Sequence, residues 1–116
     1  MFSLEQVRIS PISQGRPQTF ILELGCGIGN LWTENLSEIG NDNDITISDL
    51  SLGMVEKAKQ NLNKSNKKFK FSVIDAGKIP YQNNTFDSLI ACHMLYHVPN
   101  LTECFSEIYR VLKPGG

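Results

Sequence analysis

The segment from Glu23 to Gly29 reads Glu-Leu-Gly-Cys-Gly-Ile-Gly and directly follows the apolar run Phe20-Ile21-Leu22. Because glycine lacks a Cβ, a loop with glycine at every second position can adopt positive φ and bring its backbone N–H groups close to a ligand. A helix that begins at the end of this loop would point its free N–H donors at the same place. A buried strand, a glycine loop and a helix in this order predict a site for a nucleotide-type cofactor.

The glycine spacing separates this loop from a dinucleotide-binding loop, which requires G-x-G-x-x-G. Gly25, Gly27 and Gly29 are spaced by two, and Asn30 stands where the third dinucleotide glycine would fall. Glu23 precedes the first glycine, where a carboxylate repels a pyrophosphate and attracts a cationic amino acid group. With these residues the chain resembles the class I S-adenosylmethionine-dependent methyltransferases, whose first motif is an acidic residue followed by G-x-G-x-G. A glycine-rich turn without a ligand is the alternative interpretation.

The carboxylate of Asp49 is the second anchor of the predicted site. It ends the segment 44–49, in which β-branched and polar residues alternate as in a strand. It lies 20 residues after Gly29, where a carboxylate can accept hydrogen bonds from two ribose hydroxyls. The alternative is a carboxylate that a helix N-terminus stabilises. The resemblance implies that Leu50 offers an apolar face to the adenine.

The pair Asp75-Ala76 is the third anchor and follows the strand-like run 69–74. The resemblance implies that Asp75 accepts a hydrogen bond from the adenine amino group and that the Ala76 N–H donates to a ring nitrogen. Aspartate is also common wherever a strand ends in a turn, so the pair indicates a cofactor contact only as the third feature in the right order.

The segment from Cys92 to Pro99 resembles the stretch after the fourth strand of the family, where the cofactor's methionine part and the substrate meet. The resemblance implies a main-chain contact from Cys92 or His93 to the cofactor's amino group. His93, Tyr96 and His97 are the clustered groups that could do acid–base work near neutral pH. We favour the alternative that both histidines are polar residues beside the cofactor, and we assign no catalytic base.

The resemblance implies S-adenosyl-L-methionine as cofactor, S-adenosyl-L-homocysteine as product, and methyl transfer by in-line displacement. Such a displacement gains mainly from holding the nucleophile and the methyl group in line. The family methylates many acceptors, and the segment after the fourth strand and the nearly neutral charge favour a small molecule. The cofactor-binding residues that the resemblance implies are Glu23, Gly25, Cys26, Gly27, Gly29, Asp49, Leu50, Asp75, Ala76 and Cys92.

Apolar periodicity predicts alternating strands and helices, and therefore an α/β fold. The predicted strands are 20–24, 44–49, 69–74 and 86–92, and the predicted helices are 29–39, 52–62 and 101–112. Ser51 and Asn100 are the expected N-caps of the last two helices. In the middle helix we expect inward-facing side chains at Leu52, Val55, Ala58 and Leu62.

These elements predict a three-layer Rossmann-like sandwich around a parallel sheet. The resemblance implies the strand order 3-2-1-4. Residues 1–19 are expected to form an irregular or helical lead-in, and residues 20–116 the S-adenosylmethionine-binding domain.

The final stretch, residues 107–116, resembles the family segment that leads directly into a fifth strand. We therefore expect only the cofactor-binding half of the usual domain, without strands five to seven. The fourth strand would then be an exposed apolar edge, through which the chain could self-associate.

Two alternative functions stay open. One is a cofactor-binding or interaction module without activity. The other is a nicotinamide- or flavin-binding oxidoreductase domain, which the glycine spacing and Glu23 disfavour.

Composition bears on the number of domains and on binding to nucleic acid, metal or membrane. The chain has 116 residues and a formal net charge of −1, which indicates one domain and no nucleic-acid footprint. The basic cluster Lys64, Lys67, Lys68 and Lys70 lies between a predicted helix and strand, so we expect a solvated loop and not a phosphate site. Three cysteines without metal-type spacing indicate no metal and a reduced, cytoplasmic setting. No apolar run approaches the ~20 residues needed to span a membrane, and no cleavable leader is apparent.

Overall fold

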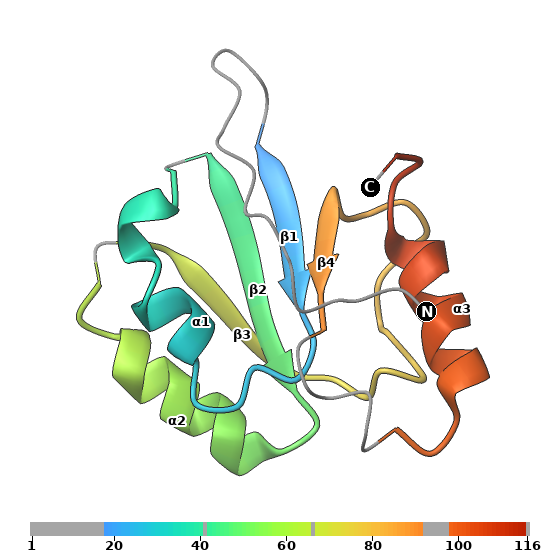
Figure 1. The fold of residues 1–116 in the computed structure, drawn as a ribbon, viewed down its shortest axis with the longest axis horizontal. Helices are drawn as coiled ribbons and strands as arrows, with labels where there is room; N and C mark the ends of the chain where they lie inside the picture. The colour runs from blue at the N-terminus through green and yellow to red at the C-terminus, as the bar shows by residue number, and fades with distance from the viewer. Residues whose placement is uncertain (1–17, 41, 66, 92–97, 116) are drawn as a thin grey trace.

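The computed structural model describes residues 18–40, 42–65, 67–91 and 98–115. The predicted lead-in therefore lies outside the described residues, apart from its last two positions. In chain order the elements are β1 (Thr19–Glu23), α1 (Asn30–Thr33), the 3-10 helix η1 (Leu36–Glu38), β2 (Asn43–Asp49), α2 (Leu52–Leu62), β3 (Phe69–Val73), β4 (Ser88–Ile90) and α3 (Leu101–Val111) (Figure 1).

The four strands form one parallel sheet in the order β3-β2-β1-β4. This confirms the predicted fold class and strand order. The register pairs Leu22 of β1 with Thr46 of β2 on one side and with Leu89 of β4 on the other. Because the strands are parallel, their carboxyl ends meet at one edge of the sheet, which we call the carboxyl rim. Strand β4 is an edge strand, and self-association through it stays a prediction.

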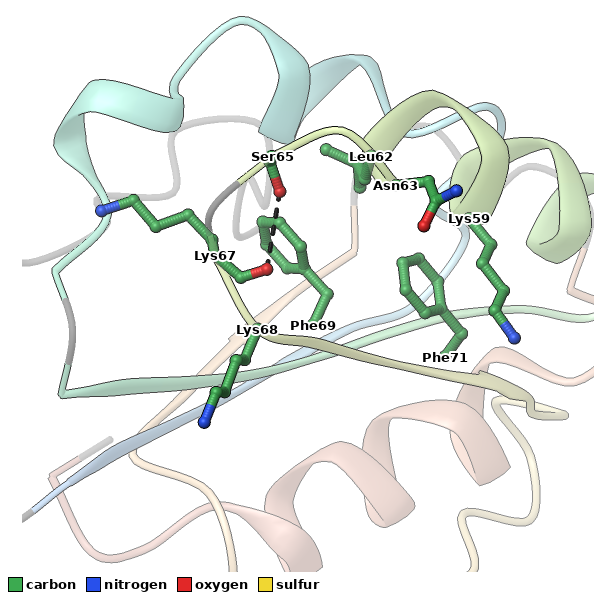
Figure 2. Close-up of a pocket in the computed structure, with 8 residues that line it drawn as sticks. All are labelled: Lys59, Leu62, Asn63, Ser65, Lys67, Lys68, Phe69 and Phe71. Atoms are coloured by element: carbon green, nitrogen blue, oxygen red, sulfur yellow. Dashed lines mark hydrogen bonds between the residues drawn. The ribbon is translucent and has the colours of Figure 1, made fainter.

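Helices cover both faces of the sheet and complete the predicted three layers (Figure 1). Neighbouring residues of β1 point to opposite faces, as strand geometry requires. Ile21 packs with Trp32 of α1 and Ala58 of α2, and the half-buried rings of Phe69 and Phe71 join this layer below the end of α2 (Figure 2). The opposite face packs against α3 through a second cluster, which includes Leu22, Leu89, Cys104, Ile108 and Val111.

Two of the three helices begin where the sequence predicts. The Ser51 hydroxyl accepts a hydrogen bond of 3.3 Å from the Met54 N–H at the start of α2. At the start of α3, the Asn100 Oδ1 accepts a 3.1 Å bond from the Glu103 N–H, and the Asn100 Nδ2 donates to the Glu103 carboxylate. Each side chain satisfies a backbone donor that the first helical turn leaves unpaired.

The prediction of one helix over 29–39 is wrong. Helix α1 ends at Thr33, and η1 follows as a separate 3-10 turn. Asn35 breaks the helix, with φ of −129° and a side-chain Nδ2 that donates a 2.6 Å hydrogen bond to the Leu31 carbonyl. That carbonyl would otherwise accept from the Asn35 backbone N–H in a continuing helix, so the side chain replaces the helical bond.

Two smaller predictions also need correction. Strand β4 covers only Ser88–Ile90, because Phe86 pairs instead with Leu112 in an isolated bridge after α3. In α2, Val55, Ala58 and Leu62 are buried as predicted, but Leu52 is 59% exposed. Leu52 lies in the first turn of the helix, at the carboxyl rim, where the sheet no longer covers it.

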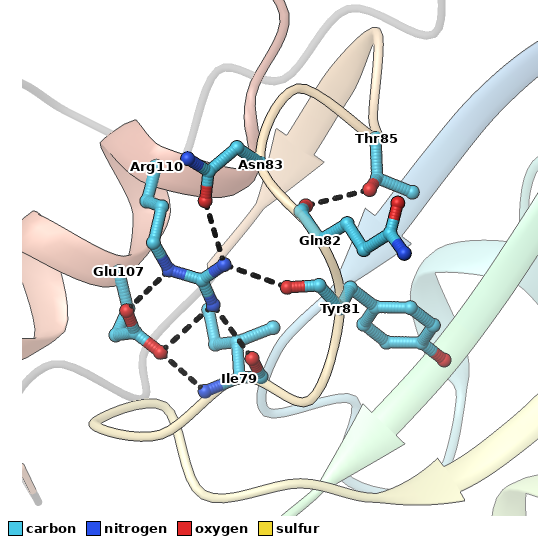
Figure 3. A network of polar contacts seen from close by, with 7 residues as sticks. All are labelled: Ile79, Tyr81, Gln82, Asn83, Thr85, Glu107 and Arg110. Carbon is cyan, nitrogen blue, oxygen red and sulfur yellow. Dashed lines mark hydrogen bonds and ion pairs between the residues drawn. The ribbon is translucent and has the colours of Figure 1, made fainter.

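Helix α3 also holds the loop between β3 and β4 through the guanidinium of Arg110 (Figure 3). The guanidinium donates hydrogen bonds of 2.7 Å to the carbonyls of Ile79 and Tyr81, and it pairs with the Glu107 carboxylate at 2.7 Å. Glu107 in turn accepts a 2.8 Å bond from the Ile79 N–H, and the bond from Arg110 lowers the pKa of Glu107. This network fixes the segment that follows Asp75 and Ala76.

Among the described residues, no helix combines the length and apolar character that crossing a membrane requires.

Candidate functional site

The loop between β1 and α1 depends on glycine at three positions. Gly25, Gly27 and Gly29 have φ of 75°, 55° and 86°, values that side chains with a Cβ rarely adopt. At Gly29 a Cβ would lie 3.2 Å from the Ala58 Cβ, so glycine is also needed for close packing against α2. At Gly27 a Cβ would meet no atom of the described residues within 4 Å. The described residues therefore leave space beside the middle of the loop at the carboxyl rim.

The Asp49 carboxylate joins this loop to the end of β2. Its Oδ2 accepts a 2.9 Å hydrogen bond from the Gly27 N–H, and its Oδ1 accepts one of 2.9 Å from the Ser51 N–H. The second bond agrees with the alternative interpretation, a carboxylate beside a helix N-terminus. A carboxylate has about four acceptor sites, so two bonds leave capacity for further donors.

The third anchor lies on the neighbouring strand at the same rim. The Ile74 N–H donates a 3.1 Å hydrogen bond to the Asp49 carbonyl, so the chain reaches Asp75 directly beside the end of β2. The Asp75 side chain is exposed and accepts a 2.8 Å bond from the Gly77 N–H, whereas Ala76 is buried. The structure therefore brings together the three anchors that the sequence placed far apart.

Glu23 is buried behind the glycine loop, with 2% of its surface exposed. Its Oε1 accepts a 2.6 Å hydrogen bond from the Trp32 Nε1. Burial raises the pKa of Glu23 from 4.5 to about 7, against the opposing effect of the Trp32 bond and with a smaller contribution from the Asp49 charge. A cation at the rim would favour the ionised form of this carboxyl group.

Cys26 is a small buried residue within the loop. Its Sγ donates to the Gly27 carbonyl at 3.3 Å. Burial, followed by the charges of Glu23 and Asp49, raises the pKa of the Cys26 thiol to about 12. The thiol therefore stays protonated at neutral pH and is a poor nucleophile.

Two supporting residues were not predicted from the sequence. The Asn61 Nδ2 of α2 donates a 2.8 Å hydrogen bond to the Ile28 carbonyl and so holds the glycine loop from outside. Trp32 fixes the Glu23 side chain through the hydrogen bond from its Nε1. Neither pairing leaves a local signal, because the partners lie on different elements. Conversely, α1 is too short to contribute the macrodipole that the predicted helix would have supplied.

Exposed apolar side chains gather at the carboxyl rim. Leu50, which follows Asp49, is 68% exposed. The others at this rim are Ile28, Leu52, Met54 and Val73. The predicted contacts from Cys92 and His93, and the acid–base candidates His93, Tyr96 and His97, lie outside the described residues.

The family described as "Methyltransferase domain" matches residues 21–116. The chain belongs to this methyltransferase family. The match covers most of the chain and confirms the class I resemblance for its N-terminal, cofactor-binding part.

Individual relatives agree with this assignment. The chain is 33% identical over 103 residues to a demethylmenaquinone methyltransferase of Symbiobacterium thermophilum, covering 87% of this chain and 41% of that protein. It is 36% identical over 107 residues to a sterol 24-C-methyltransferase of Schizosaccharomyces pombe, covering 87% of this chain and 27% of that protein. The chain therefore spans less than half the length of either relative.

A solved structure shows the same fold. The structure of phosphoethanolamine N-methyltransferase 2 from Haemonchus contortus, in complex with S-adenosyl-L-methionine, matches with a TM-score of 0.75 and 29% identity. The match covers 87% of this chain and 23% of that one.

Proposed function

We propose that this methyltransferase domain binds S-adenosyl-L-methionine at the carboxyl rim and supports methyl transfer to a small, largely apolar acceptor. One observation carries the proposal: the Asp49 carboxylate accepts a hydrogen bond from the Gly27 N–H at 2.9 Å. This contact holds the glycine loop against a carboxylate at the carboxyl ends of the strands, where open α/β sheets bind their ligands.

The residues at the rim fit the chemical groups of this cofactor. The open space beside Gly27 allows a close backbone approach, with Gly25, Cys26 and Gly29 shaping the same loop. Glu23 would attract the ammonium group of the methionine part. The free acceptor sites of Asp49 would hold the ribose hydroxyls.

The remaining predicted contacts concern the adenine and the methionine part of the cofactor. Leu50, Asp75 and Ala76 would contact the adenine, and Cys92 would add a main-chain contact to the methionine part. When bound, the cofactor supplies an electrophilic methyl group on a sulfonium sulfur. The contribution of the chain is to hold that methyl group in line with the nucleophile and away from water.

The apolar side chains at the rim support an apolar acceptor. Apart from Leu50, which is assigned to the adenine, four of the seven large hydrophobic side chains that are exposed in the described part of the chain lie there: Ile28, Leu52, Met54 and Val73. Exposed apolar patches of this kind favour apolar ligands over strongly hydrated ones. The names of two relatives, a demethylmenaquinone and a sterol methyltransferase, agree with this choice.

Calorimetric titration with S-adenosylhomocysteine and with NAD tests the cofactor assignment. We expect S-adenosylhomocysteine to bind and NAD not to bind. Binding of NAD alone would favour the oxidoreductase alternative and overturn the proposal. Absence of binding by either compound would favour a module without activity.

Transfer of a tritium-labelled methyl group tests the acceptor class. The substrates to compare are a demethylated quinone, a sterol and phosphoethanolamine. We expect label in the organic phase with one of the first two. Label transferred only to phosphoethanolamine would contradict an apolar acceptor while leaving the cofactor assignment intact.

A further inference from the structure

The side chain of Asn43, the first residue of β2, is buried and has no hydrogen-bond partner among the described residues. Only 7% of the residue is exposed, and neither its Oδ1 nor its Nδ2 has a partner in the described part of the chain. Buried amides are nearly always hydrogen-bonded, because desolvation without compensation costs free energy. An unpartnered donor and acceptor on one side chain therefore point to a ligand with a matching pair of groups.

Asn43 lines a hollow of about 470 Å³ at the amino ends of the strands. This volume lies within the range of small-molecule sites. The hollow is separate from the carboxyl rim, because the strand from Asn43 to Asp49 spans about 20 Å. Its lining is Gln18, Ile39, Gly40, Asn43, Asp44, Lys67, Lys68, Phe69 and Lys70.

The charge of this lining is positive. Lys70 pairs with Asp44 at 2.8 Å, so these two charges compensate one another. The Lys67 Nζ donates a 2.6 Å hydrogen bond to the Ile39 carbonyl, which is neutral. For Lys68 the described residues offer no ion pair or side-chain hydrogen bond, and the residue is exposed. Among the described residues, the two positive charges of Lys67 and Lys68 thus have no carboxylate partner, which favours an anionic group in the ligand.

The hollow also has an aromatic wall. Phe69 is half-buried and belongs both to this hollow and to a second one of about 420 Å³ beneath the end of α2. Figure 2 shows the rings of Phe69 and Phe71 below α2, with the side chains of Lys67 and Lys68 extending away from them. An aromatic wall beside lysines that have no carboxylate partner among the described residues can accommodate a planar ring that carries an anionic group.

We propose that this hollow binds a purine nucleotide. The Asn43 amide can pair with the donor and acceptor of a purine edge, as asparagine does with adenine. Phe69 and Ile39 would contact the ring. Lys68 would bind the phosphate, which departs from the sequence-based expectation that this basic cluster forms a solvated loop and not a phosphate site. Because the amide atoms are covered in this structure, a lining side chain must move aside first. Lys67 would add a second contact to the phosphate by giving up its bond to the Ile39 carbonyl.

The test titrates adenosine 5′-monophosphate into the ¹⁵N-labelled protein while S-adenosylhomocysteine saturates the carboxyl rim. We expect NMR shifts at the side-chain amide of Asn43 and at the backbone of Lys68 and Phe69. Adenosine and inorganic phosphate, titrated separately, should each bind more weakly than the nucleotide. Saturation of the rim keeps this result separate from the success or failure of the proposed function.

Variants then assign the contacts. Asn43→Leu removes the amide donor and acceptor while keeping a similar side-chain volume. Lys68→Ala removes the ammonium group that would bind the phosphate. Each is expected to weaken nucleotide binding by about tenfold. Lys64→Ala is the matched control, because Lys64 belongs to the same basic cluster and lines neither hollow. Its affinity should equal that of the wild type.

Thermal unfolding of Asn43→Leu adds an independent measurement. If the amide is unpartnered in the free protein, this variant should be at least as stable as the wild type. If Asn43→Leu does not fold, the nucleotide affinities of Lys68→Ala and Lys64→Ala still test the proposal, because only Lys68→Ala should weaken binding.

Three results would overturn the proposal. One is the absence of shifts at Asn43 with millimolar nucleotide. Another is phosphate binding as tight as nucleotide binding, which would indicate an anion contact only. The third is competition between the nucleotide and S-adenosylhomocysteine, which would place the nucleotide at the carboxyl rim.

Discussion

The indole Nε1 of Trp32 donates a 2.6 Å hydrogen bond to Oε1 of Glu23, and both side chains are buried. Glu23 is the acidic residue that precedes the glycine loop, and Trp32 is the single tryptophan of the chain. The protonation state of Glu23 therefore affects the fluorescence of Trp32, the strongest fluorophore of the chain. Burial raises the pKa of Glu23 to about 7, so this coupling operates near neutral pH.

We expect the fluorescence of Trp32 to change with pH around a midpoint near pH 7. Ionisation of Glu23 places a negative charge 2.6 Å from the indole nitrogen and alters its emission. The measurement is a fluorescence titration from pH 5 to 9. Glu23→Gln should abolish the transition, and an equal transition in that variant would assign it to another group.

The free energy of unfolding should fall as the pH rises from about 4.5 to about 7. The pKa of Glu23 is about 7 in the folded chain and 4.5 ordinarily, so the folded state binds the proton more tightly. The stabilisation is therefore complete below pH 4.5 and is lost above pH 7, at a total of about 3 kcal/mol. Urea unfolding at several pH values measures it. The difference between the wild type and Glu23→Gln isolates this group from the histidines.

Binding of S-adenosylhomocysteine should release a proton, if the proposed function is correct. The ammonium group of the ligand favours ionised Glu23, which is about half protonated at pH 7. Release of up to about 0.5 proton follows at that pH. Calorimetry in buffers of different ionisation enthalpy measures it. Equal proton release by the wild type and Glu23→Gln would contradict the contact.

Asp49→Ala should weaken S-adenosylhomocysteine by about 1.5–3 kcal/mol, since it removes a charged acceptor from two hydroxyls. The variant also leaves the Gly27 N–H without its acceptor, because in the wild type this N–H donates a 2.9 Å hydrogen bond to Asp49. Asp44→Ala is the control, because Asp44 lies on the same strand at the opposite end and pairs with Lys70. Unchanged affinity in Asp49→Ala would reject the ribose contact.

Alanine substitutions should separate two roles of glycine. Gly29→Ala is expected to cost roughly 2–4 kcal/mol, because a positive φ and a Cβ contact of 3.2 Å with Ala58 both oppose it. Gly27→Ala should cost only about 1–2 kcal/mol, since open space leaves the conformational penalty alone.

Gly53 supplies the control for this pair. It lies within α2 at a position with ordinary space, so Gly53→Ala should stabilise by about 0.5–1 kcal/mol. Urea unfolding compares the three variants. Equal costs at Gly29 and Gly27 would show that packing against α2 is unimportant.

Local chemistry made much of the fold predictable. The caps at Ser51 and Asn100 act within three residues of their own positions, so the starts of α2 and α3 follow from the sequence. The helix over 29–39 was mispredicted although its apolar spacing was suitable. At Asn35 a side-chain hydrogen bond competes with the helical one, and apolar periodicity does not register that competition.

The candidate site was predictable only as a set of separate anchors. Glycines at alternate positions and carboxylates after strands are visible along the chain, and parallel topology brings them to one rim. Their mutual contacts were not predictable. The bond between Gly27 and Asp49 joins residues 22 apart, and the support from Asn61 to Ile28 joins residues 33 apart.

By itself, the sequence determined the glycine loop, the order of strands and helices, and membership of the methyltransferase family. These depend on residue type and on spacing along the chain. Only the tertiary structure decided the near-neutral pKa of Glu23 and the burial of the Asn43 amide, which has no hydrogen-bond partner in the described part of the chain. Desolvation and electrostatic interaction depend on distance through space, and parallel strand pairing sets that distance between segments far apart in the chain.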